Sequence, residues 1–333
     1  MKKRIFGRVD GTAVEEITLE SASAAVSIIS LGTCVRDWRV DGPKGSLGVV
    51  LGFPKVEDYV EHARSHGVIA GRIANRTANS EFELEGRRYQ LTTNDGPNHL
   101  HGGVKGLERR VWNMDHDEKR EAVILTYSSP DGEQGYPGHV EFMVEYRLEG
   151  PRLICEMHGR PDRPTPINLA QHSYYNLGTG PDVRGHILYV DAAEYTPSDD
   201  ALIPLGTIET VEGTHLDFRT PRAVGDSPTG ETGLDNNLVL VADRDTSIPA
   251  ATVYCEETDL QLSLWTKEPA IQVFNAAEMV IDTPGHDGKR YGPYAGLCVE
   301  AQHFPDSMHN PDWPSIIRTP ENPYFQQLMV EIG

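Results

Sequence analysis

The chain has 333 residues, enough for one large domain or two ordinary ones, and its 38% hydrophobic and 24% charged residues are typical of a globular protein. Thirty Lys and Arg against fifty Asp and Glu give a formal charge of −20, which disfavours nucleic acid and anionic membranes as partners. The 32 Gly and 23 Pro indicate many turns, and therefore many short strands rather than long helices.

No segment is predicted to direct the chain into a membrane or out of the cell. The basic residues 1–4 are followed by charged residues, where a secretion signal needs an apolar run. No stretch approaches the ~20 apolar residues of a membrane-spanning helix. The four cysteines are far apart in the sequence, so we expect free, buried thiols at Cys34, Cys155, Cys255 and Cys298. These features favour a cytoplasmic protein.

Helical spacing occurs clearly in one short segment, which lies between Pro54 and Gly67. Its apolar residues fall on one stripe of a helix: Val56, Tyr59, Val60 and Ala63. The segment therefore predicts a short connecting helix.

Elsewhere, alternation with a period of two predicts antiparallel strands. Residues 82–91 form one predicted hairpin, which turns at Glu85-Gly86. Residues 140–155 form a longer one, in which five apolar side chains share a face: Val140, Phe142, Val144, Tyr146 and Leu148. Residues 260–264 and 270–274 add two further strands. Because no repeat or linker interrupts the chain, we expect an all-β fold with one domain over 1–333, a single large antiparallel β-sandwich with a few short connecting helices.

Three segments carry side chains suited to chemistry, and the first is 71–103. His101 precedes two glycines, which allow a backbone segment or a ligand to approach closely. A loop histidine without a chemical role is the alternative interpretation. His99 and His101 form the one close histidine pair and could bind a metal from one strand, but the spacing places no further ligand.

The second segment surrounds His172. Its neighbours Gln171 and Ser173, and two tyrosines after them, supply hydrogen-bonding groups that could orient the imidazole. A structural histidine within a satisfied polar network is the alternative.

The third segment surrounds Glu300. In a strand, Cys298, Glu300 and Gln302 share one face, whereas the residues between them are apolar and share the other. Burial would raise the pKa of Glu300 and make its carboxylate a better base near neutral pH. An exposed glutamate on an edge strand is the alternative. The sequence contains no GxSxG elbow, dinucleotide-binding motif or P-loop.

Taken in order, these segments resemble the galactose mutarotase (aldose 1-epimerase) family over nearly the whole chain. The similar blocks are Gly71-Arg72-Ile73-Ala74-Asn75-Arg76, Asn98 to Gly103 with Trp112 after it, Ser128 to Gly138, His172 to Leu177, Leu216 to Arg219, Gly233 to Asp235, and Glu300 to Gln302 followed by Pro305-Asp306. Several ordered blocks are more specific than any one motif.

The resemblance implies a galactose mutarotase-like supersandwich fold and an isomerase that acts on a small sugar without a metal or organic cofactor. Glu300 would be the general base, and His172 the general acid. His101 would polarise the ring oxygen. The residues that would position the sugar are Asn75, Arg76, Asp235 and Gln272. A monomer and a homodimer both fit the sequence.

The reaction explains these residue types. Exchanging the two anomers requires removal of the proton of the C1 hydroxyl and protonation of the ring oxygen, after which C1 rotates and the ring closes. We expect the carboxylate and a protonated imidazole on opposite sides of the C1–O5 unit. Each positioned acid or base contributes roughly 10²–10⁴-fold. Galactose and glucose are candidate substrates.

Two departures from the family bear on which aldose is preferred. Many members have His where this chain has Asn236, and the sequence after Gln272 differs at Phe274-Asn275-Ala276. Two other functions stay open at this point. A non-catalytic carbohydrate-binding domain would be expected to lack Glu300 or His172, and a β-sandwich glycoside hydrolase or lyase would need a second carboxylate, for which Asp235 is the candidate.

Overall fold

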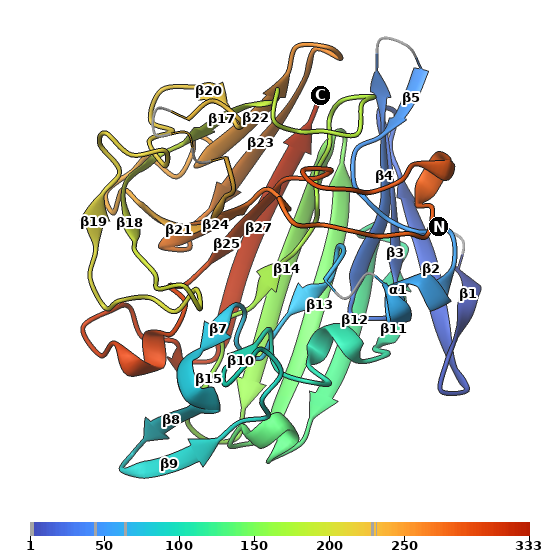
Figure 1. Ribbon diagram of the computed structural model, residues 1–333. Coiled ribbons are helices and arrows are strands. Elements are labelled where there is room, and N and C mark those ends of the chain that lie inside the picture. Colours follow the sequence, from blue (N-terminus) through green and yellow to red (C-terminus); the bar gives the residue numbers. More distant parts are fainter. Residues whose placement is uncertain (1–2, 43–44, 63–64, 228–229, 231) are drawn as a thin grey trace.

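The computed structural model describes residues 3–42, 45–62, 65–227, 230 and 232–333. These residues form three larger antiparallel sheets, four two-stranded ribbons and several short helices (Figure 1). No helix in this described part of the chain is long and apolar enough to cross a membrane.

The largest sheet has nine strands, and its central members run through the middle of Figure 1. In spatial order its strands are β11 (Asn113–Asp117), β12 (Ala122–Ser129), β13 (Val140–Glu149), β14 (Arg152–Pro161), β27 (Tyr324–Ile332), β23 (Leu260–Thr266), β22 (Ala251–Cys255), β17 (Ile187–Val190) and β20 (Arg222–Ala223). The last long strand of the chain, β27, joins the early strands to the later ones, because it pairs with both β14 and β23.

Two five-stranded sheets lie to either side in Figure 1, blue on the right and yellow to red on the left. The N-terminal sheet contains β1 (Lys3–Val9), β2 (Thr12–Glu20), β3 (Ala24–Ile29), β4 (Cys34–Gly42) and β5 (Gly45–Gly48). The second, here called the site sheet, has the order β19 (Glu209–Thr210), β18 (Ala192–Thr196), β21 (Asp235–Leu240), β24 (Ala270–Phe274) and β25 (Cys298–Gln302).

Short elements connect the sheets. The ribbons are β6 (Ile69–Ala70) with β16 (Ala170–Gln171), β7 (Arg76–Thr77) with β10 (His99–Leu100), β8 (Glu81–Leu84) with β9 (Arg87–Gln90), and β15 (Thr165–Pro166) with β26 (Ile317–Arg318). The helices are α1 (Val56–Glu61), η1 (Ala78–Ser80), η2 (Leu107–Arg109), η3 (Glu133–Gly135), η4 (His286–Gly288) and η5 (Ser307–His309).

One continuous apolar core joins the three larger sheets. Trp38 of β4, Phe142 of β13 and Val273 of β24 belong to the same cluster of buried side chains. Fully burying a side chain of this size contributes about 1.5–3 kcal/mol. The expected all-β sandwich is therefore confirmed, and its shared core fixes the site sheet relative to the rest.

The local predictions agree with the structure at most positions. The five alternating side chains of β13 are buried, and β8 and β9 form the predicted hairpin. All four cysteines are free and buried. The predicted helix forms as α1, with Val56 and Tyr59 buried and Val60 38% exposed. Ala63 lies outside the described residues.

Arg72 has a structural role that its position in a shared motif did not reveal. Its guanidinium is buried and donates to Ser129 Oγ at 2.8 and 3.0 Å, and to the backbone oxygens of Ser129, Pro130, Pro137 and Gly138 at 2.9–3.1 Å. The Arg72 side chain thus holds both ends of the 129–138 loop. Arg72 lies three residues before Asn75 in the sequence.

We predict that Arg72→Met lowers the free energy of unfolding by about 3 kcal/mol or more, because it leaves several buried carbonyls without a donor. Urea unfolding followed by circular dichroism measures the change. Arg8→Met is the control, since Arg8 is exposed and donates to the neighbouring Gly11 carbonyl. Equal stability of the two variants would contradict the proposed role of Arg72.

Candidate active site

The site sheet has one apolar and one polar face. Glu300 of β25 lies directly opposite Gln272 of β24, which lies opposite Asn237 of β21. Side chains that are opposite each other in neighbouring strands point to the same face. The alternate residues, such as Val273 and Val299, lie in the core. The polar face therefore points away from the core, and β25 is a sheet edge on which Glu300 is nevertheless only 2% exposed.

His172 reaches Glu300 from a different part of the chain. It follows β16, and its backbone N–H donates to the Val68 carbonyl while its own carbonyl accepts from the Gly67 N–H, both at 2.9 Å. These bonds hold the residue in place, and its imidazole Nε2 lies 3.5 Å from Glu300 Oε1. Both side chains are buried. The structure thus brings together the two predicted acid–base residues.

Burial makes charge on either member of this pair unfavourable. It raises the pKa of Glu300 well above its usual value, and the carboxylate of Asp235 adds to the effect. It also lowers the pKa of His172 to about 4. Burial therefore disfavours any state in which only one of the two side chains is charged.

The two side chains lie side by side, with His172 Nε2 3.5 Å from Glu300 Oε1. Their placement on opposite sides of a sugar's C1–O5 unit stays a prediction. The C1 hydroxyl oxygen and the ring oxygen are attached to the same carbon, so adjacent groups can reach both from one side.

Asn75 and His101 hold each other beside this pair. The Asn75 N–H donates to His101 Nδ1 at 3.1 Å, and the His101 N–H donates to the Asn75 carbonyl at 3.0 Å. The ring of His101 meets that of His172 edge to face, with 5.2 Å between ring centroids. Gly102 is required here as predicted, because a side-chain carbon at this position would lie 1.7 Å from the Gly71 carbonyl oxygen.

The remaining predicted site residues form a linked polar group. Gln272 Nε2 donates to Asp235 Oδ1 at 2.6 Å, and an Arg76 nitrogen lies 3.8 Å from Asp235 Oδ2. Arg76 also donates to Asp95 at 2.8 Å. Burial raises the pKa of Asp235, although the nearby Arg76 opposes the change. All seven predicted residues therefore lie in one region: Asn75, Arg76, His101, His172, Asp235, Gln272 and Glu300.

Several buried oxygens on this polar face have no hydrogen-bond partner within the described protein, among them Glu300 Oε2, Gln272 Oε1 and Asn237 Oδ1. Leaving a buried polar atom unpaired costs about 1–3 kcal/mol. Each of these atoms can accept a hydrogen bond from a hydroxyl group. The unsatisfied acceptors thus fit a ligand rich in hydroxyls.

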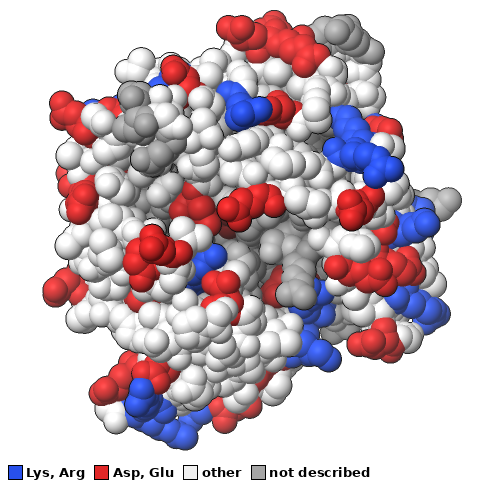
Figure 2. Space-filling view, viewed as in Figure 1, with Lys and Arg blue, Asp and Glu red and all other residues white. Residues whose placement is uncertain are grey.

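An open cleft of about 910 Å³ includes Arg76 and Asp235 in its lining. A small pocket that shares these two residues with the cleft is also lined by Asn75 and Gln272. Tyr174 and Phe274 line the cleft as well, and Figure 2 shows a hollow near the middle of the face with acidic side chains around it. Phe274 and Tyr174 meet edge to face at 6.0 Å and form an apolar wall. The Phe274 departure from the family thus lies in the cleft, as does Asn236.

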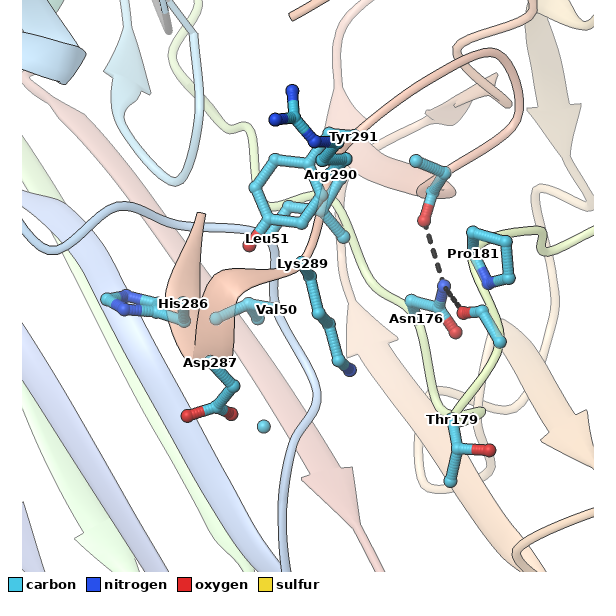
Figure 3. A pocket seen from close by; sticks show the side chains of 13 residues that line it. Val50, Leu51, Asn176, Thr179, Pro181, His286, Asp287, Lys289, Arg290 and Tyr291 are labelled. Atoms are coloured by element: carbon cyan, nitrogen blue, oxygen red, sulfur yellow. Dashed lines mark hydrogen bonds between the residues drawn. The ribbon is translucent and has the colours of Figure 1, made fainter. Parts of the chain in front are cut away.

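A second cavity is smaller and contains none of the predicted site residues. It measures about 160 Å³ and lies between the 176–181 and 286–291 segments, where Asn176, Lys289 and Tyr291 line it (Figure 3). The amide of Asn176 is engaged there, since it donates to the Gly180 and Ala295 carbonyls. His286 and Asp287 also line this cavity, but Asp287 forms an ion pair with Arg39 and His286 Nε2 contacts the Arg36 carbonyl. The large cleft, which contains Arg76 and Asp235, is therefore the candidate active site.

The geometry bears on the metal-binding alternatives. The two ring nitrogens of His99 contact the Thr92 carbonyl at 2.5 Å and Tyr136 Oη at 2.6 Å, so this ring is turned away from His101. A different trio, His172, Cys298 and Glu300, has ligand atoms within 4.8 Å of one another. However, Cys298 contacts Nδ1 of the imidazole and Glu300 lies near Nε2.

Sequence reasoning missed several residues near the site. Tyr174 packs against His172 with 5.0 Å between ring centroids, and His66 stacks on Tyr174 at 4.3 Å. The signal for Cys298 was visible, because it shares a strand face with Glu300. For His66 we find no signal in the sequence. Both of its ring nitrogens are buried without a hydrogen-bond partner, and burial lowers its pKa to about 3.

We predict that His66→Phe stabilises the protein, by about 1–3 kcal/mol, because it removes unpaired polar atoms from surroundings formed by Phe53, Tyr174 and Tyr291. The gain should be larger at pH 5 than at pH 7. The unfolded histidine binds a proton below about pH 6.5, whereas the folded one stays neutral to about pH 3, so the wild type loses stability as the pH falls through this window.

Urea unfolding at the two pH values measures this difference. His62→Phe, at an exposed position on the same segment, is the control and should show neither effect. A His66→Phe variant that is less stable than wild type at both pH values would show that the ring has a partner.

Comparison with known proteins identifies the family of the chain. Residues 15–330 match the aldose 1-epimerase family. The chain is 34% identical to rat galactose mutarotase, over 97% of this chain and 95% of that protein, and 34% identical to Escherichia coli aldose 1-epimerase, over 92% and 90%. An aldose epimerase homologue from C. elegans superimposes with a TM-score of 0.91 at 27% identity, covering 96% of this chain and 99% of that one. Galactose 1-epimerase from Lactobacillus acidophilus gives 0.86, also at 27% identity, over 100% and 98%. The chain therefore belongs to the aldose 1-epimerase family of isomerases.

Proposed function

We propose that the protein interconverts the α and β anomers of a free aldose, such as galactose or glucose, with Glu300 as general base and His172 as general acid. The observation that carries this proposal is the buried contact of 3.5 Å between Glu300 Oε1 and His172 Nε2. A carboxyl and an imidazole at this spacing can act on two oxygens of one carbon at the same time.

The two residues carry out the reaction by moving two protons. In the form of the pair in which Glu300 is ionised and His172 is protonated, the carboxylate takes the proton of the C1 hydroxyl while the imidazolium gives one to the ring oxygen, so the bond between C1 and the ring oxygen breaks. The open aldehyde rotates about its C1–C2 bond. Ring closure then reverses both transfers and can form either anomer. Because the pair ends with the protons it began with, it needs no other reactant.

The surrounding residues fit the task of holding the sugar. Asp235 and Gln272 lie beside Glu300, and Arg76 is aligned by Asp95. His101 lies against the His172 ring, where its imidazole can assist at the ring oxygen. Asn75 supports His101 through their reciprocal hydrogen bonds. Hydroxyl groups can pair with this set, and an analogue that leaves buried members unpaired binds more weakly.

The alternatives are weaker. A binding domain without activity has no use for a buried carboxyl aligned on an imidazole, which costs stability unless function maintains it. For a glycosidase, Asp235 would have to act opposite Glu300, yet its Oδ1 already accepts from Gln272, the cross-strand neighbour of Glu300.

We predict that Glu300→Gln slows catalysed mutarotation by roughly 10²–10⁴-fold, because the amide cannot accept the hydroxyl proton. Polarimetry of a freshly dissolved α-anomer measures the rate. Glu268→Gln is a matched control, since Glu268 is also a buried carboxyl 3.5 Å from a histidine nitrogen, but its partner is His303 rather than His172. A Glu300→Gln variant with full activity would exclude Glu300 as the base.

A second experiment distinguishes the isomerase from a glycosidase. With a panel of fresh aldose anomers, the wild-type protein should speed the approach to the equilibrium rotation. Incubation with glycosides should produce no new reducing ends. Release of reducing sugar without faster mutarotation would reverse the assignment.

A further inference from the structure

Cys298 contacts the His172 ring at Nδ1, the nitrogen that does not take part in the proposed proton transfer. Its Sγ lies 3.5 Å from His172 Nδ1, whereas Nε2 on the other side of the ring faces Glu300. Cys298 and Glu300 are two residues apart on one face of β25, so the same strand holds both sides of the imidazole. The sulfur is fully buried.

The proposed chemistry requires one particular tautomer of His172. If Nε2 gives its proton to the ring oxygen and later recovers it, the neutral ring must keep its hydrogen on Nδ1 in between. The group that holds Nδ1 decides which tautomer is present. A hydrogen kept on Nδ1 leaves one proton to move between Nε2 and Glu300 Oε1.

We propose that Cys298 is a positioning residue for His172: its sulfur accepts a hydrogen bond from Nδ1–H and so presents Nε2 to Glu300 and to the sugar. This inference rests on the proposed role of His172 and adds a residue that acts through it. Cys298 itself does not touch the substrate or move a proton.

A thiol suits this position because it is a weak, neutral acceptor. Burial raises the pKa of Cys298 well above its usual value, and Glu300 and Asp235 add to the effect, so the sulfur stays a thiol. A carboxylate on Nδ1 would make the ring more basic and would hold its proton more tightly. The weak acceptor orients the ring while the imidazolium stays acidic enough to protonate an ether oxygen.

The tautomer can be measured without any activity. Nitrogen-15 NMR of protein labelled at histidine distinguishes Nδ1–H from Nε2–H, and the His172 signals are assigned by their loss in His172→Gln. We expect the hydrogen on Nδ1 in the wild type and in Cys298→Ser, and a shift towards Nε2–H in Cys298→Ala. A wild-type ring with its hydrogen on Nε2 would overturn the proposal.

Kinetics supply the second measurement. Cys298→Ala should lower kcat for mutarotation roughly 10-fold with little change in KM, and Cys298→Ser should restore most of the rate, because the hydroxyl can also accept from Nδ1. Cys255→Ala is the matched control, since it removes a buried strand thiol away from the cleft. Equal kcat values for Cys298→Ala and the wild type would refute the positioning role.

The two proposals fail in different ways. If the wild type does not accelerate mutarotation, the proposed function is wrong whatever the NMR spectrum shows. If the wild type is active and the spectrum of His172 is unchanged in Cys298→Ala, only the role of Cys298 is wrong.

Discussion

The site depends on keeping a carboxyl and an imidazole in contact with each other and out of water. Neither Glu300 nor His172 could be buried singly as a charged group without a large loss of free energy. Held 3.5 Å apart, each side chain gives the other a partner for its proton or its charge. The fold fixes this distance from two directions, because β25 belongs to the site sheet whereas the segment of His172 pairs with residues 67–70. Much of the architecture around the cleft serves to bring these two segments together.

The local fold could be predicted from the sequence wherever one strand has one buried face. The alternation in β13 and the turns after β8 and β13 depend on neighbouring residues alone. In α1, Val60 belongs to the apolar stripe but is exposed, because a helix of six residues buries little more than one turn. Which strands share a sheet could not be read locally. The chain-end strand β27 lies between β14 and β23, and pairing between distant segments leaves no mark in either one.

The site was predicted only in part, for the same reason. Family resemblance gave the seven residues that the structure brings together. It gave no basis for separating Arg72, which supports a loop, from Arg76, which reaches the cleft, although both belong to one block. Cys298 was on the correct face of its strand, but its contact with His172 spans 126 residues of sequence. The orphaned nitrogens of His66 arise from packing, which only the folded chain defines.

Charge around the cleft matches a neutral ligand. Arg76 is the cation among the predicted site residues, and Asp95 and Asp235 both lie against it. Glu61, Asp200 and Glu278 add acidic groups to the walls. A sugar phosphate would meet this field with its own negative charge, whereas a free sugar meets only hydrogen-bonding groups. The site is therefore acidic, as is the whole chain with its formal charge of −20.

The segments that line the cleft and the residues that carry out the proposed chemistry come from different parts of the chain. The walls of the cleft come from separate segments: Asp200 precedes β19, His215 follows it, and Met279 and Val280 follow β24. None of these segments supplies Glu300 or His172. Natural variation or directed evolution can therefore change these lining segments, and with them the sugar that enters, without changing Glu300 or His172. Substitutions near Arg72 would be tolerated less well, because they would disturb both the 129–138 loop and the neighbouring Asn75.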